Sequence, residues 1–105
     1  MTNNMKFKTE YVKLLEDIIA CAEEELNYIS KKHYSKWNEI QLQNVVLPEM
    51  RELLLYARNG RLFFKYGKKQ RQLESTYMVT DSFEKLNMTI LGRMILDLQK
   101  IYNTL

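Results

Sequence analysis

The chain has few of the residues that interrupt or cross-link small proteins, with three Gly, one Pro and one Cys among 105 residues. Turn-rich all-β domains need glycine and proline at regular intervals, so this scarcity argues against such a fold and predicts long helices. A lone Cys21 cannot form an internal disulfide, and nothing therefore indicates an oxidising compartment.

Residues with catalytic or metal-binding chemistry are also scarce. His33 is the single histidine, and no cysteine or acidic residue stands at zinc-binding spacing from it. The Glu-x-x-His pairs of di-iron bundles, a glycine-rich phosphate loop and a dinucleotide fingerprint are all missing. The hydroxyl-rich run 74–82 has no histidine near it in sequence to serve as a base. We therefore expect no catalytic residue, no metal site, no cofactor and no enzymatic activity.

Long apolar segments are absent as well. The longest unbroken apolar runs, 18–22 and 53–57, are far shorter than the roughly 20 residues that cross a bilayer, and the N-terminus lacks the apolar part of a signal peptide. We expect a soluble, cytoplasmic protein without membrane contact. The length of 105 residues and the hydrophobic content of 46% predict one globular domain over 1–105, with residues 1–5 flexible.

Two long segments carry apolar residues at the helical spacing of three and four. They cover residues 7–32 and 82–103, and Asp81 followed by Glu84 resembles a capping box at the start of the second. The apolar arc of the first helix is broader than one packing partner needs, which permits a homodimer as well as coverage by several elements.

A third helix is predicted over residues 35–59, with Ser35 as its N-terminal cap. Pro48 predicts a break within it, because proline donates no N–H and its ring clashes with the preceding turn. Pro48 is equally suited to the first turn of a new helix that continues to Asn59-Gly60.

Residues 61–79 have two interpretations. Alternation of Leu73, Ser75, Tyr77 and Val79 with polar neighbours favours a β-hairpin, whereas a helix over 70–79 is the alternative. The fold class is thus a mainly α helical bundle of three principal helices, with a β-hairpin or a short fourth helix at 61–79. A hairpin would leave the first and last helices parallel, and a segment that runs the length of the bundle would make them antiparallel.

Glu25 and Asn87 are polar residues within the apolar arcs of the first and last helices. An unpaired buried carboxylate is costly, so Glu25 is expected to find a hydrogen-bonding or cationic partner, bind water or be protonated. The two residues would come level, as one candidate polar site, only in the antiparallel arrangement. We otherwise expect Glu25 to be structural, near a helix end where the core thins.

The net charge of +3 is distributed unevenly. Residues 53–73 hold six basic residues and no acidic one, which leaves 10 of the 16 basic residues against all 13 acidic residues in the rest of the chain. Phe63 lies within this segment, and we predict a binding site formed by Arg58, Arg61, Phe63, Lys65, Lys68, Lys69 and Arg71.

These features favour a small non-enzymatic protein-binding module of the regulatory, adaptor or inhibitor type that uses residues 58–71. The expected partner is a protein with an acidic surface, or a second copy of the chain. The alternative is a small nucleic-acid-binding protein that uses the same segment, since cations follow phosphates and aromatic rings stack on bases.

Overall fold

The computed structural model describes residues 2–60, 72–84 and 88–105, with side chains described from residue 9 onward. Its elements are α1 (Thr2–Ser30), the π-helical segment η1 (Gln41–Val46), α2 (Leu47–Arg58), α3 (Glu74–Ser82) and α4 (Ile90–Thr104). The predicted mainly α helical bundle is confirmed.

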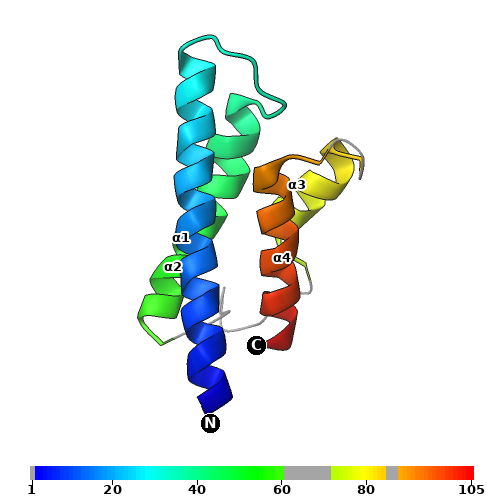
Figure 1. Cartoon of the computed structure of the whole chain (residues 1–105). Helices are drawn as coiled ribbons and strands as arrows, with labels where there is room; N and C mark the ends of the chain where they lie inside the picture. The colour runs from blue at the N-terminus through cyan, green and yellow to red at the C-terminus, as the bar shows by residue number, and fades with distance from the viewer. Residues whose placement is uncertain (1, 61–71, 85–87) are drawn as a thin grey trace.

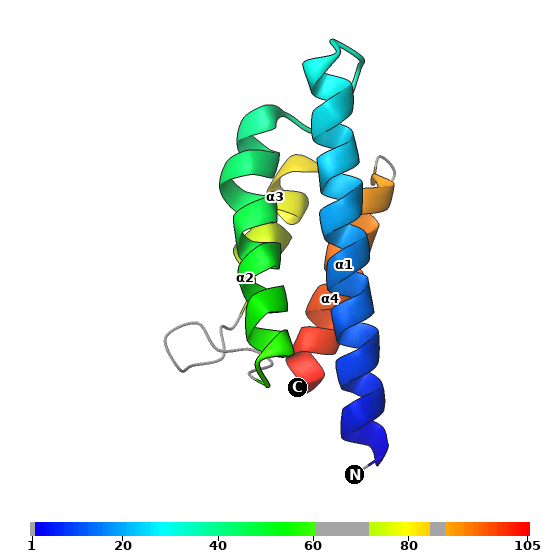
Figure 2. The same cartoon turned by 90° about the vertical axis from the view of Figure 1, so that its left-hand side faces the viewer.

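The helices form an up-and-down arrangement. α1 packs against α2, α4 and η1, and α3 packs against α4 and η1. Figures 1 and 2 show that α1 and α4 run antiparallel, with the two chain ends at the same end of the bundle. Of the two arrangements considered for the first and last helices, the structure therefore has the one that brings the start of α4 toward the C-terminal half of α1.

α1 corresponds to the helix predicted over 7–32, but it begins at Thr2. Tyr11, Leu15, Ile18 and Ala22 are fully buried, at the spacing of one helical face. The helix ends in a Schellman motif, in which His33 N–H donates to Tyr28 O at 2.9 Å. The left-handed position of that motif is occupied by Lys32, with φ of 62°, where glycine is the usual residue.

The next helix begins at an asparagine. Asn38 Oδ1 accepts from Gln41 N–H at 2.8 Å, and Gln41 Oε1 accepts from Asn38 N–H at 2.9 Å, which is a reciprocal capping box. The prediction that Ser35 caps this helix is wrong, because the Ser35 hydroxyl is engaged with Glu25 instead.

The predicted break near Pro48 takes the form of a change in helix type. η1 leads directly into α2, in which Pro48 lies in the first turn, and Leu47 N–H donates to Leu42 O five residues earlier. A proline ring clashes with the carbonyl four residues before it, and the wider π turn ends immediately before this position. The chain therefore passes Pro48 without leaving the helical conformation.

Within 61–79 the described part is helical from Glu74 onward, so the hairpin is wrong there, and residues 61–71 lie outside the described part. Leu73, Thr76 and Val79 are buried at helical spacing, while Tyr77 is exposed. Local alternation suggested a strand, but contacts from α2 and α4 to the N-terminus of α3 favour the helix.

The predicted capping box at Asp81 and Glu84 is also wrong. Asp81 lies in the last turn of α3, and α4 begins later, at Ile90. Its cap is Thr89, whose Oγ1 accepts from Gly92 N–H at 2.9 Å.

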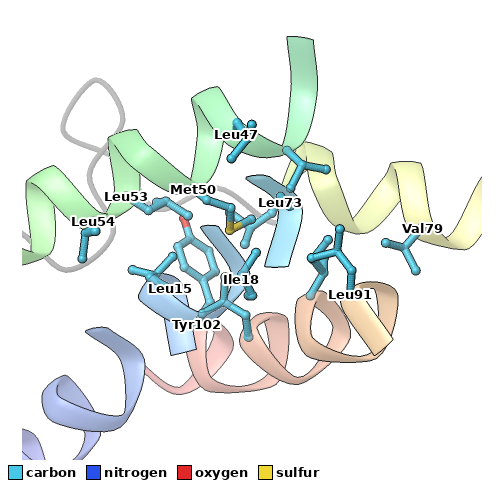
Figure 3. Packing of buried hydrophobic residues seen from close by; sticks show 14 of the residues in the cluster. Leu15, Ile18, Leu47, Met50, Leu53, Leu54, Leu73, Val79, Leu91 and Tyr102 are labelled. Carbon is cyan, nitrogen blue, oxygen red and sulfur yellow. The ribbon is translucent and has the colours of Figure 1, made fainter. Parts of the chain in front are cut away.

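The hydrophobic core lies between all four α-helices. Figure 3 shows side chains that converge from α1, α2 and α4 and from the residues around α3, among them Leu15, Ile18, Met50, Leu73, Val79, Leu91 and Tyr102. Within the described residues, no helix is both long enough and apolar enough to cross a membrane.

Candidate functional site

The predicted basic binding segment is only partly described. Arg58 is the last residue of α2, and its Nη2 lies 3.1 Å from Glu16 Oε2 of α1 in an exposed ion pair. Arg61, Phe63, Lys65, Lys68, Lys69 and Arg71 lie outside the described residues, and the site predicted there stays a prediction.

Glu25 accepts a short hydrogen bond at the end of the bundle opposite to Arg58. The half-buried carboxylate accepts from Ser35 Oγ at 2.7 Å, and the same hydroxyl oxygen accepts from Trp37 N–H at 3.0 Å. This is the expected partner for a polar group near a helix end, although it is a serine rather than a cation. Asn87, the other member of the predicted pair, lies outside the described residues.

Trp37 continues this chain of contacts to α4. The residue is 4% exposed, and its Nε1–H donates to Thr89 Oγ1 at 3.0 Å. Thr89 Oγ1 thus accepts from both Trp37 and Gly92. The hydrogen bonds run from Glu25 of α1, through Ser35 and Trp37, to the cap of α4.

The same end of the bundle is joined to α3. The Trp37 and Phe83 ring centroids lie 4.8 Å apart, and Gln41 Nε2 donates to Ser82 Oγ at 3.2 Å. We call this region the Trp37 end and define it as the described residues among 31–41 and 82–90. Segments that are distant in sequence meet there (Figure 1).

A pocket of about 580 Å³ opens at the Trp37 end. Its lining consists of Tyr34, Ser35, Lys36, Ser82, Phe83 and Glu84. Tyr34 is 88% exposed, Ile40 is 69% exposed and Ile90, the first residue of α4, is 79% exposed. The pocket therefore has one aromatic ring on each side, Tyr34 and Phe83, among polar lining residues, and Ile40 and Ile90 are exposed at the same end of the bundle.

A second depression, of about 410 Å³, lies between α1 and the helix formed by η1 and α2. Leu26, Ile29 and Leu47 supply apolar surface, and the Arg51–Glu23 ion pair, 3.3 Å between Nη2 and Oε2, joins its two walls. Both residues of this ion pair line the depression, and each already has a charged partner.

A buried polar cluster fixes the N-terminus of α3. Glu49, in the first turn of α2, accepts from the backbone N–H groups of Glu74 and Ser75, both at 2.8 Å. Gln99 of α4 accepts from Leu73 N–H at 2.9 Å and from Thr76 Oγ1 at 2.8 Å. These contacts replace the side-chain cap that Leu73 cannot provide, which indicates a structural role.

Tyr11 lies near this cluster and is fully buried. Its hydroxyl has no hydrogen-bond partner among the described residues. Burial raises the pKa of the Tyr11 phenol well above its ordinary value of 10.0, and the charges of Tyr102 and Glu49 raise the pKa further. The phenol is therefore neutral across the physiological range and is not suited to act as a base.

Cys21 and His33, the other two residues with potentially reactive side chains, have contacts that indicate a structural role. The Cys21 thiol is half-buried, and burial, followed by the nearby Glu25 and Glu24 carboxylates, raises its pKa and disfavours the reactive thiolate. The His33 ring packs edge-on against Tyr28, with 6.0 Å between centroids. In the described parts of the chain, no three His, Cys, Asp or Glu side chains form a group that could hold a metal ion.

Sequence reasoning missed the Trp37 end, although part of its signal was present. Residues 31–36 read KKHYSK, a run with three lysines, an aromatic ring and no acid. Asn38 and Gln41 also have the spacing of a capping box. The approach of residues 82–84 and Thr89 to this run depends on tertiary packing and had no signal in the sequence.

Comparison with protein-family models, with curated proteins and with solved structures found no match to this chain.

Proposed function

We propose that the protein is a small non-enzymatic protein-binding module and that the Trp37 end is its principal contact surface. The observation that carries this proposal is the placement of exposed apolar side chains. Tyr34, Ile90 and Ile40 are the three most exposed large hydrophobic residues in the described chain, and all belong to the Trp37 end. Exposed apolar groups that gather at one place are typical of interaction sites.

The framework beneath this surface supports the proposal. Trp37 is buried and hydrogen-bonded to Thr89, and its ring contacts Phe83, so the Phe83 wall of the pocket rests on packed residues. A surface held in its binding conformation loses little side-chain freedom on association. Aromatic side chains at the centre of such a surface commonly contribute most of the binding energy.

The basic segment 58–71 is proposed as a second, charge-based contact for an acidic protein surface. Neutralisation of Lys65, Lys68, Lys69 and Arg71 together is expected to slow partner association while the fold is retained, because surface charges mainly set the rate of encounter. Unchanged association rates would assign recognition to the Trp37 end alone. A gel-shift titration across salt tests the nucleic-acid alternative, which requires binding that weakens steeply with ionic strength.

Site-specific cross-linking tests the principal surface. A photoreactive phenylalanine analogue replaces Tyr34 in one variant and Tyr77, an exposed tyrosine on α3, in a matched control. After irradiation in the producing cells, discrete protein adducts are expected at position 34 and not at position 77. Absence of adducts at position 34 would contradict the proposal for this surface. If further variants with the photoreactive residue within 61–71 also form no adducts, the protein-binding function is contradicted.

A further inference from the structure

The connector between α1 and the next helix carries positive charge to the pocket. Lys31, Lys32, Tyr34 and Lys36 are exposed, and residues 31–36 contain no acidic residue. Among the described residues, no ion pair joins Lys31 or Lys32 to a carboxylate. Two ammonium groups are thus available in the chain that leads into the Tyr34 wall.

The other wall of the pocket differs in charge. Phe83 is half-buried against Trp37, and Glu84 lines the pocket beside it. Asp81 is exposed in the last turn of α3, just before this wall. The pocket lining has one charged residue on each side, Lys36 on the connector and Glu84 after α3, with Tyr34 and Phe83 as its aromatic rings; Lys31, Lys32 and Asp81 are exposed residues nearby in sequence that do not line it.

We propose that the pocket at the Trp37 end binds a peptide segment of a partner protein that carries one large apolar side chain, with Asp or Glu on the side facing the connector. The apolar side chain would cover the Tyr34 and Phe83 rings, and the carboxylates would pair with Lys31 and Lys32. Acidic residues on the opposite side of the segment would meet Glu84 and Asp81 and be repelled. This inference rests on the proposed protein-binding function and specifies the chemistry of the partner.

Contacts beneath the connector hold this wall in place. The Ser35 hydroxyl is hydrogen-bonded to both the Glu25 carboxylate and the Trp37 backbone N–H. The backbone on either side of Ser35, at Tyr34 and Lys36, therefore has a defined path. Lys32 is fixed in the left-handed conformation by the Schellman motif. The backbone path from Lys32 to Trp37 is consequently held by hydrogen bonds before a partner arrives.

The test uses a displayed library of random 12-residue peptides. Selection is carried out on the wild-type chain, with counter-selection on Tyr34→Ala; Tyr77→Ala is the matched control. Selected sequences are expected to share a large apolar residue with Asp or Glu on one side of it. Affinities of the synthesised peptides are then measured by fluorescence anisotropy at two salt concentrations.

Charge reversal makes the test specific. The Lys31→Glu/Lys32→Glu variant is expected to bind the selected peptides at least tenfold more weakly, and Lys100→Glu, an exposed lysine of α4, to bind them as the wild type does. Peptides whose Asp and Glu are replaced by Lys should regain affinity for the doubly reversed variant. Circular dichroism and thermal melting establish that every variant is folded.

The outcomes separate this inference from the proposed function. Peptides with Lys or Arg beside the apolar residue, or peptides that bind the doubly reversed variant unchanged, would overturn the inference and leave the protein-binding function standing. Failure to select any peptide, together with no cross-link at position 34 or within 61–71, would contradict both. Binding of an oligothymidylate probe that is lost in the doubly reversed variant, with no peptide selected, would assign the surface to nucleic acid.

Discussion

Trp37 and Thr89, 52 residues apart in sequence, are joined by a hydrogen bond of 3.0 Å from the indole Nε1–H to the hydroxyl oxygen. That oxygen also caps α4 by accepting from Gly92 N–H. One threonine therefore fixes both the connector after α1 and the start of the last helix. Phe83, which lines the pocket proposed for binding, packs against the ring of this Trp37.

Replacement of Thr89 is expected to destabilise the protein. Thr89→Ala removes the cap and leaves the buried Trp37 N–H without this acceptor, for a loss of about 2 kcal/mol in the free energy of unfolding. Thr89→Ser keeps the oxygen and should recover most of the loss. Urea unfolding followed by tryptophan fluorescence measures both, and equal losses in the two variants would show that the hydroxyl oxygen is unimportant.

Lys32 offers a stabilising substitution. A side chain at φ of 62° is strained, so Lys32→Gly is expected to raise the free energy of unfolding by about 0.5–1 kcal/mol. Gly60 is the matched reverse case, with φ of 79° and open space around an added Cβ. Gly60→Ala should lower stability by about 1 kcal/mol through the same backbone preference. Thermal melts of the two variants that shift in the same direction would contradict this explanation.

Glu49 is expected to be essential for the position of α3. Glu49→Ala leaves the N–H groups of Glu74 and Ser75 without their buried acceptor, and we expect a loss of about 3 kcal/mol. Glu23→Ala, which removes an exposed carboxylate paired with Arg51, should change stability by less than about 0.5 kcal/mol. Hydrogen exchange of the first amides of α3 should accelerate in the Glu49 variant alone. Retained protection there would mean that Gln99 holds the helix by itself.

Tyr11 predicts a stability difference at alkaline pH. Because burial raises the pKa of the folded phenol above 10.0, the unfolded chain loses this proton first, and stability falls as pH rises above 10.0. Below pH 10.0 the phenol is neutral in both the folded and the unfolded state, so this pH-dependent loss of stability is absent there. Tyr11→Phe removes it, so the wild type should lose up to about 1.4 kcal/mol per pH unit relative to the variant. Parallel stability curves between pH 9 and 11 would contradict the raised pKa.

Tyr11→Phe is informative at neutral pH as well. The hydroxyl is buried without a hydrogen-bond partner in the described chain, so its removal should leave stability at pH 7 unchanged or slightly higher. A loss above about 1 kcal/mol at pH 7 would indicate that the hydroxyl has a partner such as a buried water.

The sequence predicted the long helices because their apolar faces repeat at the period of the backbone. It failed for residues 73–79, where alternation over a few positions resembled a strand. There the helix is stabilised by Glu49 and Gln99, which lie more than 20 residues away. It failed again at Asp81, since a capping pattern is equally compatible with the end of one helix and the start of another.

The candidate site shows the same division. Glu25 was identified from its place on an apolar face, and the need for a hydrogen-bonding partner followed from the cost of a buried charge. Its partner Ser35 was assigned to a helix cap instead. The basic run 58–71 is visible in the sequence, whereas the pocket at the Trp37 end depends on segments that meet only after folding.

The helical class of the bundle and the buried faces of its long helices follow from periodicity within single segments, so the amino-acid sequence is enough to predict them. The direction of α4 relative to α1, the helical state of residues 74–82 and the meeting of Trp37, Phe83 and Thr89 are set by tertiary packing. These features depend on contacts between distant segments, whose free energies no local pattern records.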